Sequence, residues 1–310
     1  MLRSLVIGDL NVDIIVSGAP QLPVLGHEIP CDDIQTVMGA ASIFACRLAQ
    51  LGGKVDIFGK VGNDANGDVV MRNFRLSGVG INKVKVIEGF KTGITISLTY
   101  PENRALITYM SGIDNLTESD LDPELFRGYS HLHVSSIYIL RKLLSSFLRI
   151  FSEAKKQGLT TSLDTNADPF NKYEHVGEIL NYVDIFFPND KEAKAITGSN
   201  SVHSALERLY EKVPVVIIKR GEKGAIGKHN DKKVTVKSAD IEPVDTTGAG
   251  DSFDAGFIYY FLHKNKDFQA SIKFANALGA LSCLYIGGAE KRITEADVLD
   301  FMNRQNQRGS

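Results

Sequence analysis

The sequence lacks several features that mark common functional classes. Its three cysteines, Cys31, Cys46 and Cys283, are odd in number and far apart, so neither a disulfide framework nor a zinc site is expected. The first apolar run already breaks at Gly8 and Asp9, too early for a signal peptide or a membrane span. With 35 basic and 37 acidic residues the net charge is −2, which argues against nucleic-acid binding through a general basic field. We therefore expect a cytoplasmic protein that contacts neither nucleic acid nor membrane.

What the chain does contain is a regular alternation of short apolar segments and helical patterns. Residues 5–8 and 159–163 are short apolar runs that predict buried strands. Apolar side chains recur at helical spacing between such runs, and the predicted helices are residues 41–51, 143–157, 252–263 and 268–284. The alternation predicts one α/β domain over residues 1–310, in which a mostly parallel sheet is covered by helices on both faces.

Two segments do not fit this layering. Residues of about 11–37 and 91–112 are rich in β-forming side chains and contain no helical pattern. We expect them to form a small antiparallel lid beside the main domain. Polar side chains at strand ends are then candidate ligand contacts, because open parallel sheets bind ligands beyond the carboxyl ends of their strands.

The segment with the clearest chemistry is Asp-Thr-Thr-Gly-Ala-Gly-Asp-Ser-Phe at 245–253. Two glycines around an alanine directly before a long helix can turn successive backbone N–H groups toward one anion, and the helix N-terminus adds partial positive charge there. Asp251 falls in the first helical turn, where the dipole favours the ionised form that a general base needs. The alternative is an ordinary glycine turn with an aspartate helix cap. Neither the dinucleotide fingerprint nor the P-loop motif is present.

Residues 245–257, DTTGAGDSFDAGF, closely resemble the carboxy-terminal motif of the ribokinase-like (PfkB) carbohydrate kinases. Further motifs extend the resemblance from residue 5 to about residue 293. It implies a ribokinase-like three-layer α/β/α fold with a small β-sheet lid, and ATP and Mg²⁺ as cofactors. In that family the aspartate at this position deprotonates the acceptor hydroxyl, and the preceding segment is the anion hole. The catalytic residues implied here are Gly248, Ala249, Gly250 and Asp251.

On the substrate side, Asp9, Asn11 and Asp13 alternate with apolar residues, so an extended strand would place them on one face. A solvated edge strand is the alternative. The resemblance favours a sugar-binding role for Asn11 and Asp13 above Asp9, because the family's first strand leads into a similar Asn-x-Asp.

The resemblance to the family's amino-terminal glycine motif is imperfect. Gly39 and Ala40 could allow close approach of the backbone to the substrate, but Met38 replaces the companion glycine and Ile43 the usual substrate-binding asparagine. A glycine helix start is the alternative. Substrate recognition is therefore expected to differ from that of ribokinase.

Two further segments contribute candidate substrate contacts. Residues 162–169 look like the family's Asp-x-Asn-x-Arg strand end, which implies that Asn166 lies near the substrate and the phosphates. Asp168 replaces the arginine that serves acidic sugars, which argues against an acidic substrate. The second segment is the lid, where Arg104 stands among mostly polar side chains that could contact a sugar.

The nucleotide side is implied by three shorter motifs. Asn189 and Glu192 resemble the family's Asn-x-x-Glu, which positions Mg²⁺ largely through water, although the same spacing is also a helix capping box. The remaining nucleotide candidates follow a strand end, a glycine turn and a helix, and are Lys219, Gly221, Gly224 and Asn276. Asp245 and Thr247, with backbone carbonyls near Cys283 and Gly288, match a loop that binds potassium in many relatives.

These residues predict ATP-dependent phosphorylation of a primary hydroxyl of a small sugar, fructose-like or another ketose or pentose. A nucleoside kinase of the same fold is the alternative, and a non-catalytic regulatory relative is a third reading. The resemblance also implies a homodimer formed through the lid. His131 and His133 lie on one strand face without a third metal ligand nearby, so we expect packed histidines.

Overall fold

The computed structural model describes residues 2–99, 104–110, 113–122 and 124–308. Within them, a nine-stranded sheet forms the centre of the body. In sheet order its strands are β13 (Lys232–Val236), β12 (Ala225–His229), β11 (Val215–Lys219), β10 (Ile185–Phe186), β9 (Thr160–Asp164), β8 (His131–Ser135), β1 (Arg3–Ile7), β4 (Lys54–Gly62) and β5 (Gly80–Ile87). Neighbouring strands pair in parallel except at β11–β12 and β12–β13.

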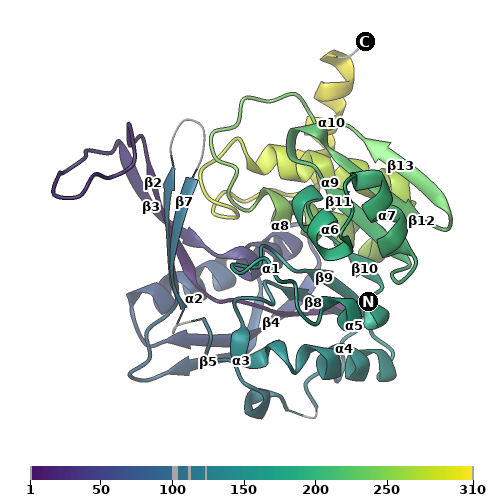
Figure 1. Cartoon of the computed structure of the whole chain (residues 1–310), viewed down its shortest axis with the longest axis horizontal. Helices are drawn as coiled ribbons and strands as arrows, with labels where there is room; N and C mark the ends of the chain where they lie inside the picture. Colours follow the sequence, from purple (N-terminus) through teal and green to yellow (C-terminus); the bar gives the residue numbers. More distant parts are fainter. Residues whose placement is uncertain (1, 100–103, 111–112, 123, 309–310) are drawn as a thin grey trace.

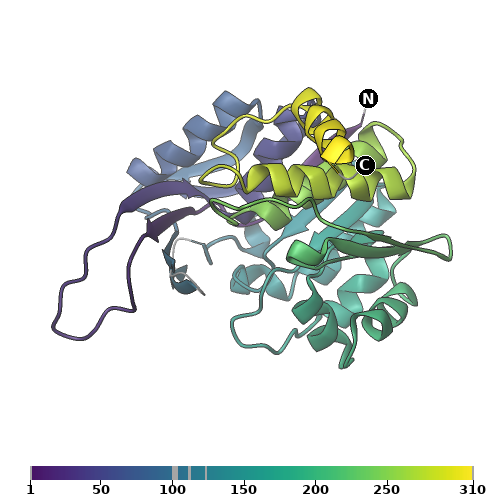
Figure 2. The ribbon, with the colours of Figure 1, turned by 90° about the horizontal axis from the view of Figure 1, so that it is seen from above.

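Helices cover both faces of this sheet (Figures 1 and 2). Within β1, Val6 packs into one hydrophobic core, whereas Leu5 and Ile7 pack into the other, as strand alternation requires. The Val6 core is completed by α1 (Ala40–Gln50), α2 (Ala65–Ser77), α8 (Ala249–Ile258), α9 (Phe268–Ser282) and α10 (Glu295–Arg308). The opposite core is completed by α3 (Arg141–Leu144), α4 (Phe147–Lys156), α5 (Val176–Ile179), α6 (Asp190–Thr197) and α7 (Val202–Tyr210). The predicted three-layer α/β/α fold is confirmed.

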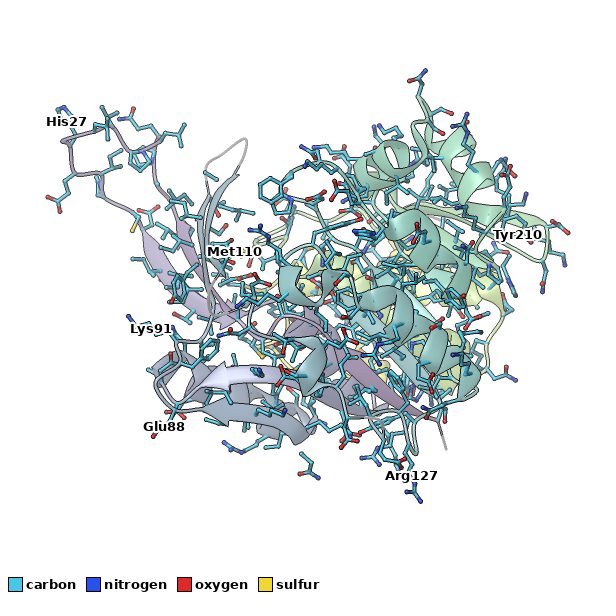
Figure 3. The ribbon with its side chains drawn as sticks, turned by 60° about the horizontal axis from the view of Figure 1, so that its bottom comes forward. His27, Glu88, Lys91, Met110, Arg127 and Tyr210 are labelled. Atoms are coloured by element: carbon cyan, nitrogen blue, oxygen red, sulfur yellow. The ribbon has the colours of Figure 1, made fainter. Side chains whose placement is uncertain are left out.

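A second, four-stranded sheet stands apart from the body (Figure 1). Its order is β3 (Asp33–Met38), β2 (Val12–Ser17), β6 (Ile94–Thr99) and β7 (Arg104–Tyr109). The hairpins β2–β3 and β6–β7 are antiparallel, but β2 and β6 pair in parallel, so the fully antiparallel lid that we expected is wrong. The reason is connectivity: β2 follows β1 and β6 follows β5, and both body strands end at the same edge of the main sheet. The loop between β2 and β3 projects far from the body, with His27 near its tip (Figures 2 and 3).

The helix predicted over 143–157 is also different in the structure. It is divided into α3 and α4, with Ser145 and Ser146 between them. The hydroxyl of Ser146 donates to Glu118 at 3.1 Å, and serine side chains that bond elsewhere weaken a continuing helix. No helix in the described ranges is long and apolar enough to cross a membrane. The treatment of residues 1–310 as a single domain stays a prediction.

His131 and His133 are packed in the interior, as expected. The two rings share the hydroxyl of Ser162, at 2.9 Å from His131 Nε2 and 2.8 Å from His133 Nδ1. The His133 ring stacks on Phe44, with ring centroids 3.6 Å apart. Burial lowers the pKa of His131 to about 3 and that of His133 well below its ordinary value, so both rings are neutral in the folded state.

These histidines make folding stability dependent on pH. The pKa of His131 is lower in the folded than in the unfolded chain, so its contribution is complete above about pH 6.5 and is lost as the pH falls toward 3. Urea unfolding at about pH 7.5 and about pH 5 should show a loss of roughly 2 kcal/mol from this one ring. The variant His131→Gln should show a smaller loss between the two pH values, whereas His27→Gln, on the exposed arm, should show the wild-type loss. An equal loss in both variants would contradict this assignment.

Candidate active site

The glycine segment before α8 adopts the geometry of an anion-binding turn. Gly248 is the N-cap of α8 and has a φ of 70°, a left-handed conformation that favours glycine. A Cβ atom at Gly248 would also lie 2.7 Å from Cδ1 of Ile43 and 2.8 Å from Cα of Gly288. Ile43 therefore packs beneath the turn, and its apolar side chain offers no hydrogen bond to a substrate. The first N–H groups of α8 lack partners within the helix, as at any helix start.

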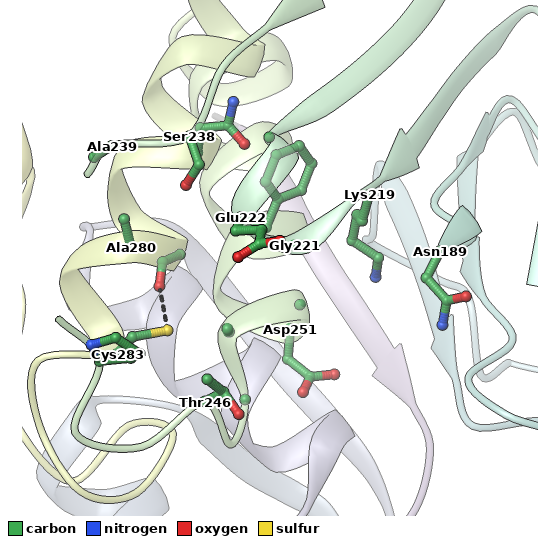
Figure 4. A pocket seen from close by; sticks show the side chains of 18 of the residues that line it. Asn189, Lys219, Gly221, Glu222, Ser238, Ala239, Thr246, Asp251, Ala280 and Cys283 are labelled. Atoms are coloured by element: carbon green, nitrogen blue, oxygen red, sulfur yellow. Dashed lines mark hydrogen bonds between the residues drawn. The ribbon is translucent and has the colours of Figure 1, made fainter. Parts of the chain in front are cut away.

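A cavity of about 890 Å³ opens beside this turn (Figure 4). Its walls are the end of β11, the turn 221–224, the segment 238–243, the start of α8 and one side of α9. Figure 4 shows the side chains of Lys219 and Asp251 converging on the same part of the cavity. The space suits an extended ligand with an anionic end at the start of α8. The predicted residues that line it are Asn166, Asn189, Glu192, Lys219, Gly221, Gly224, Gly248, Ala249, Gly250, Asp251 and Asn276.

Asp251 lies in the first turn of α8 and is 9% exposed. Burial, followed by the nearby Asp164, raises the pKa of its carboxyl to about 7, while the Lys219 ammonium acts in the opposite direction. The helix dipole favours the ionised form, as expected from the position of Asp251, but desolvation raises the pKa more than the dipole lowers it. A carboxyl with a pKa near neutrality is nevertheless well suited to accept a proton at physiological pH.

Lys219 pairs with two buried carboxylates close to Asp251. Its Nζ lies 2.6 Å from Oδ2 of Asp164 and 3.0 Å from Oδ2 of Asp254, and both carboxyl side chains are at most 2% exposed. Burial opposes the charge of Lys219, but the two carboxylates outweigh burial and raise the pKa of its ammonium. A Cβ at Gly250 would lie 3.4 Å from Nζ. The ammonium therefore borders the anion-binding turn, where a negatively charged group would contact it.

Asn189 and Glu192 form the capping box that the alternative interpretation required. The Asn189 side chain accepts from the amides of Lys191 and Glu192, and the Glu192 carboxylate accepts from the amide of Asn189. Glu192 is only 3% exposed, and burial together with Asp164 raises its pKa to about 7. Capping thus holds this carboxyl at the cavity wall.

A divalent cation fits the chemistry of this wall. Repulsion from Asp164 contributes to the raised carboxyl pKa values of Glu192 and Asp251, and a cation in the cavity would relieve it. The described residues contain no group of three or more histidine, cysteine or acidic side chains that could hold a metal ion by themselves. A Mg²⁺ ion would therefore depend on phosphate oxygens and water for most of its ligands.

The substrate-side residues meet where the lid joins the body. Nδ2 of Asn11 donates to Oδ1 of Asp13 at 2.9 Å and to Oγ1 of Thr95 at 3.3 Å. Oδ1 of Asn11 is buried and has no hydrogen-bond partner within the described residues. A Cβ at Gly39 would collide with this oxygen, so glycine is required for the close approach. Ala40 follows as the first residue of α1.

Asp9 has a different role from the one that strand alternation suggested. It precedes β2 and does not belong to the strand. Burial raises the pKa of its carboxyl, while the nearby Ser136 hydroxyl and the amides at the start of α1 act in the opposite direction. Gly39 provides no side-chain cap, and the carboxyl of Asp9 lies beside the start of α1, where a Cβ at Gly39 would be 2.8 Å from its Oδ2.

Asn166 is fixed in an uncommon conformation at the end of β9. Its φ is 51°, its amide nitrogen Nδ2 donates to Ser136 Oγ at 2.9 Å, and its backbone N–H donates to Asp164 at 3.1 Å. Asp168 accepts three backbone amides of the following turn and therefore stabilises the loop. Arg104 lies in β7, and its side chain is outside the described residues.

The remaining nucleotide-side residues shape the walls of the cavity. Gly221 and Gly224 have φ values of 55° and 77°, and a Cβ at Gly224 would lie 2.6 Å from the amide nitrogen of Ser238. Asn276 Nδ2 donates to the carbonyls of Val236 and Lys237 at 3.3 and 3.4 Å. Its amide nitrogen thus links α9 to the end of β13.

At the predicted cation loop, Asp245 is already bonded to the protein's own donors. The two carboxylate oxygens of Asp245 accept from the amides of Thr247 and Gly287, each at 2.9 Å. The carbonyl of Gly288 accepts from Nε of Arg47 at 2.9 Å. A second cation at that carbonyl would meet the charge of Arg47, so the described residues do not fit a potassium ion there.

Sequence reasoning missed two acidic members of the site, Asp164 and Asp254. Asp254 follows Asp251 by one helical turn, so the i, i+3 spacing was a usable signal that both lie on the same helix face. Asp164 ends a predicted strand, but only the folded structure shows that both carboxylates bind Lys219. The wall formed by 238–243 carried no recognisable motif.

Comparison with known proteins identifies the family. The model of the pfkB family carbohydrate kinases matches residues 4–295. An uncharacterized sugar kinase of Archaeoglobus fulgidus is 31% identical over 79% of this chain and 96% of its own length. An ATP-dependent ribose-1-phosphate kinase of Halopiger xanaduensis is 28% identical over 91% of this chain and 92% of its own. A fructokinase of Xylella fastidiosa solved with bound ATP has the same fold, with a TM-score of 0.83, 18% identity and coverage of 99% and 100%.

The chain therefore belongs to the pfkB family of carbohydrate kinases, and it is a sugar kinase of that family.

The raised pKa of Asp251 predicts the pH dependence of any reaction that uses it as a base. Activity requires the ionised carboxyl, so kcat/KM should rise with pH and level off above about 7. Because Lys219 lowers this pKa, Lys219→Met should move the rising limb to higher pH. The control Lys155→Met removes a lysine paired with Asp184 at the other end of the strands and should leave the limb in place. A Lys219→Met profile with the wild-type midpoint would contradict the assignment.

Proposed function

We propose that this kinase transfers the γ-phosphoryl group of ATP to a primary hydroxyl of a small neutral sugar, fructose-like or another ketose or pentose. Asp251 is the general base and residues 248–251 are the anion hole. The observation that carries the proposal is a nearly buried carboxyl with a pKa of about 7 in the first turn of the helix whose start forms the anion-binding turn. The same carboxyl lines the cavity beside that turn.

In the proposed reaction, Asp251 accepts the proton of the sugar hydroxyl. The alkoxide oxygen forms a bond to the γ-phosphorus as the bond to the oxygen of ADP breaks, so ADP leaves on the opposite side. Backbone N–H groups at the start of α8 and the ammonium of Lys219 stabilise the charge on the transferred group. A bound Mg²⁺ would supply further neutralisation of the phosphate oxygens, and Glu192, which lines the cavity, would help to hold it through water.

The lid face above the substrate side favours a sugar over a nucleoside. Strand register aligns Asp13, Thr95 and Thr108 in one row, and the two threonine hydroxyls lie 3.2 Å apart. The next row, Ile14, Ile96 and Ile107, lies on the other face by alternation. The row that continues from Asn11 is therefore polar and matches hydroxyl groups, whereas a nucleobase would be better covered by apolar side chains.

A substrate panel should include fructose, ribose, other ketoses and pentoses, ribose 1-phosphate, acidic sugars and nucleosides, because the names of the relatives include ribokinase, fructokinase and ribose-1-phosphate kinase. ADP release from ATP should be fastest with a neutral sugar. Faster turnover of a nucleoside than of every sugar would favour the alternative.

With the best substrate, Asp251→Asn should lower kcat by about 10²- to 10⁴-fold, the usual contribution of a general base. The rise in melting temperature on adding ATP should be retained, since the cavity stays intact. Asp68→Asn, an exposed aspartate in the first turn of α2, is the matched control and should keep wild-type kcat. A near-normal rate in Asp251→Asn would exclude Asp251 as the base.

The predicted homodimer is supported by the outer face of the lid. Ile34, Ile107 and Tyr109 are 60%, 63% and 45% exposed, and strand register puts them on the face opposite Asp13. We propose that a second copy of the chain covers this apolar face. Light scattering should give the mass of a dimer, and Ile107→Lys should give a monomer. Leu76→Lys, at a 70% exposed position on α2, should not change the mass. A monomeric wild type would refute the proposal.

A further inference from the structure

A buried guanidinium lies next to the anion-binding turn. Arg47 in α1 is 0% exposed, and it heads the largest fully buried side chains among the described residues. None of its hydrogen-bond acceptors in the described ranges is a carboxylate. Burial lowers its pKa to about 10, so the side chain remains cationic at neutral pH. The interior of the protein thus contains a full positive charge whose direct partners are neutral oxygen atoms, and the carboxylate of Glu290 is close enough to favour that charge.

Those oxygen atoms belong mainly to the loop after α9. Nε of Arg47 donates to the carbonyl of Gly288 at 2.9 Å, and Nη1 donates to the carbonyl of Lys291 at 2.7 Å. Nη1 also donates to Oε1 of Gln50 at 2.8 Å, and Gln50 in turn donates to the carbonyl of Ala289 at 2.8 Å. Residues 288–291 are therefore folded around the guanidinium, as a carbonyl loop folds around a metal cation.

The same loop is in direct contact with the anion-binding turn. A Cβ at Gly248 would lie only 2.8 Å from Cα of Gly288. The amide of Gly287 donates to Asp245 at 2.9 Å. Arg47 also reaches α8 itself, because its Nε lies 3.3 Å from Oγ of Ser252. The amide of Ser252 in turn donates to the carbonyl of Gly248 at 2.8 Å.

We propose that Arg47 is a built-in cation that takes the place of a free monovalent cation in this kinase. It is a positioning residue: it holds residues 287–291 against Gly248 and adds positive potential to the anion hole without touching the substrate. The reaction is accordingly independent of potassium. The inference rests on the proposed function, since the anion hole is taken to bind the transferred phosphoryl group.

The unmodified protein provides the first test. Activity, and separately the rise in melting temperature on adding ATP, is measured in potassium, sodium and tetramethylammonium chloride at equal ionic strength. Both quantities should agree within about twofold among the three salts, because no site prefers potassium. A severalfold activation by potassium, or an ATP-induced rise in melting temperature that requires potassium, would overturn the proposal.

Substitution provides the second test. Arg47→Ala should lower kcat by about tenfold or more, as weakening of an anion hole does, with little change in KM for the sugar. Guanidinium chloride at low concentration should restore part of kcat, whereas urea, which has the same planar shape without the charge, should not. Equal rescue by urea, or wild-type kcat in Arg47→Ala, would contradict the proposal. Arg72→Ala, at an exposed position of α2, is the control and should keep wild-type kcat.

The variant Arg47→Lys and the melting series in the three salts separate the role of Arg47 from a failure to fold and from a failure of the proposed function. Arg47→Lys keeps the charge but has a single donor group, so it should fold where Arg47→Ala does not and should show intermediate kcat. If Arg47→Lys is as inactive as Arg47→Ala, the charge is not the feature that matters and the proposal fails. Absence of phosphoryl transfer to every sugar in every salt would count against the proposed function. The melting series in the three salts would still decide the role of Arg47.

Discussion

The structure at the carboxyl edge of the sheet depends on one ammonium group. Lys219 joins three elements: it ends β11 and contacts carboxylates at the end of β9 and in α8. Without that cation, Asp164 and Asp254 would face each other in a buried setting, and an unpaired buried charge is costly. The position of α8, and with it that of Asp251, therefore depends on a long-range ion pair as well as on apolar packing.

Two buried cations border the anion-binding turn. Lys219 lies on its cavity side, and Arg47 lies beside the loop that supports Gly248. Both act at short range in an environment of low dielectric constant, where a single charge has more effect than many exposed charges. The near-neutral composition of the chain, with a net charge of −2, is thus compatible with a site that handles several phosphate charges.

The parts of the site that sequence could predict are those that depend on local conformation. Gly248 and Asp251 were found because a glycine turn and a helix start lie within a few residues of each other. The pairing of Lys219 with Asp164 and with Asp254 was not predictable, since these residues are separated from it by 55 and 35 positions, respectively. Arg47 did leave a signal: its i, i+3 spacing from Phe44 places an arginine on the apolar face of α1, and both side chains are fully buried.

Other differences also came from tertiary connections. The parallel pairing of β2 with β6 follows from where β1 and β5 end, and no local pattern encodes that. The position of Asp9 beside the start of α1 likewise depends on tertiary structure, because α1 follows it by some thirty residues. The fold class was predictable because alternating strands and helices permit few arrangements, and the family motif selected among them.

The parallel pairing of the lid has a mechanical consequence. Both hairpins leave the body on the same side, after Ile7 and after Ile87, and are hydrogen-bonded to each other along β2 and β6. The four strands therefore form one sheet, and a displacement of one hairpin would be passed to the other through the ladder between β2 and β6. The side chain of Asn11 ties the two hairpins together at their base, because it donates to Asp13 on β2 and to Thr95 on β6.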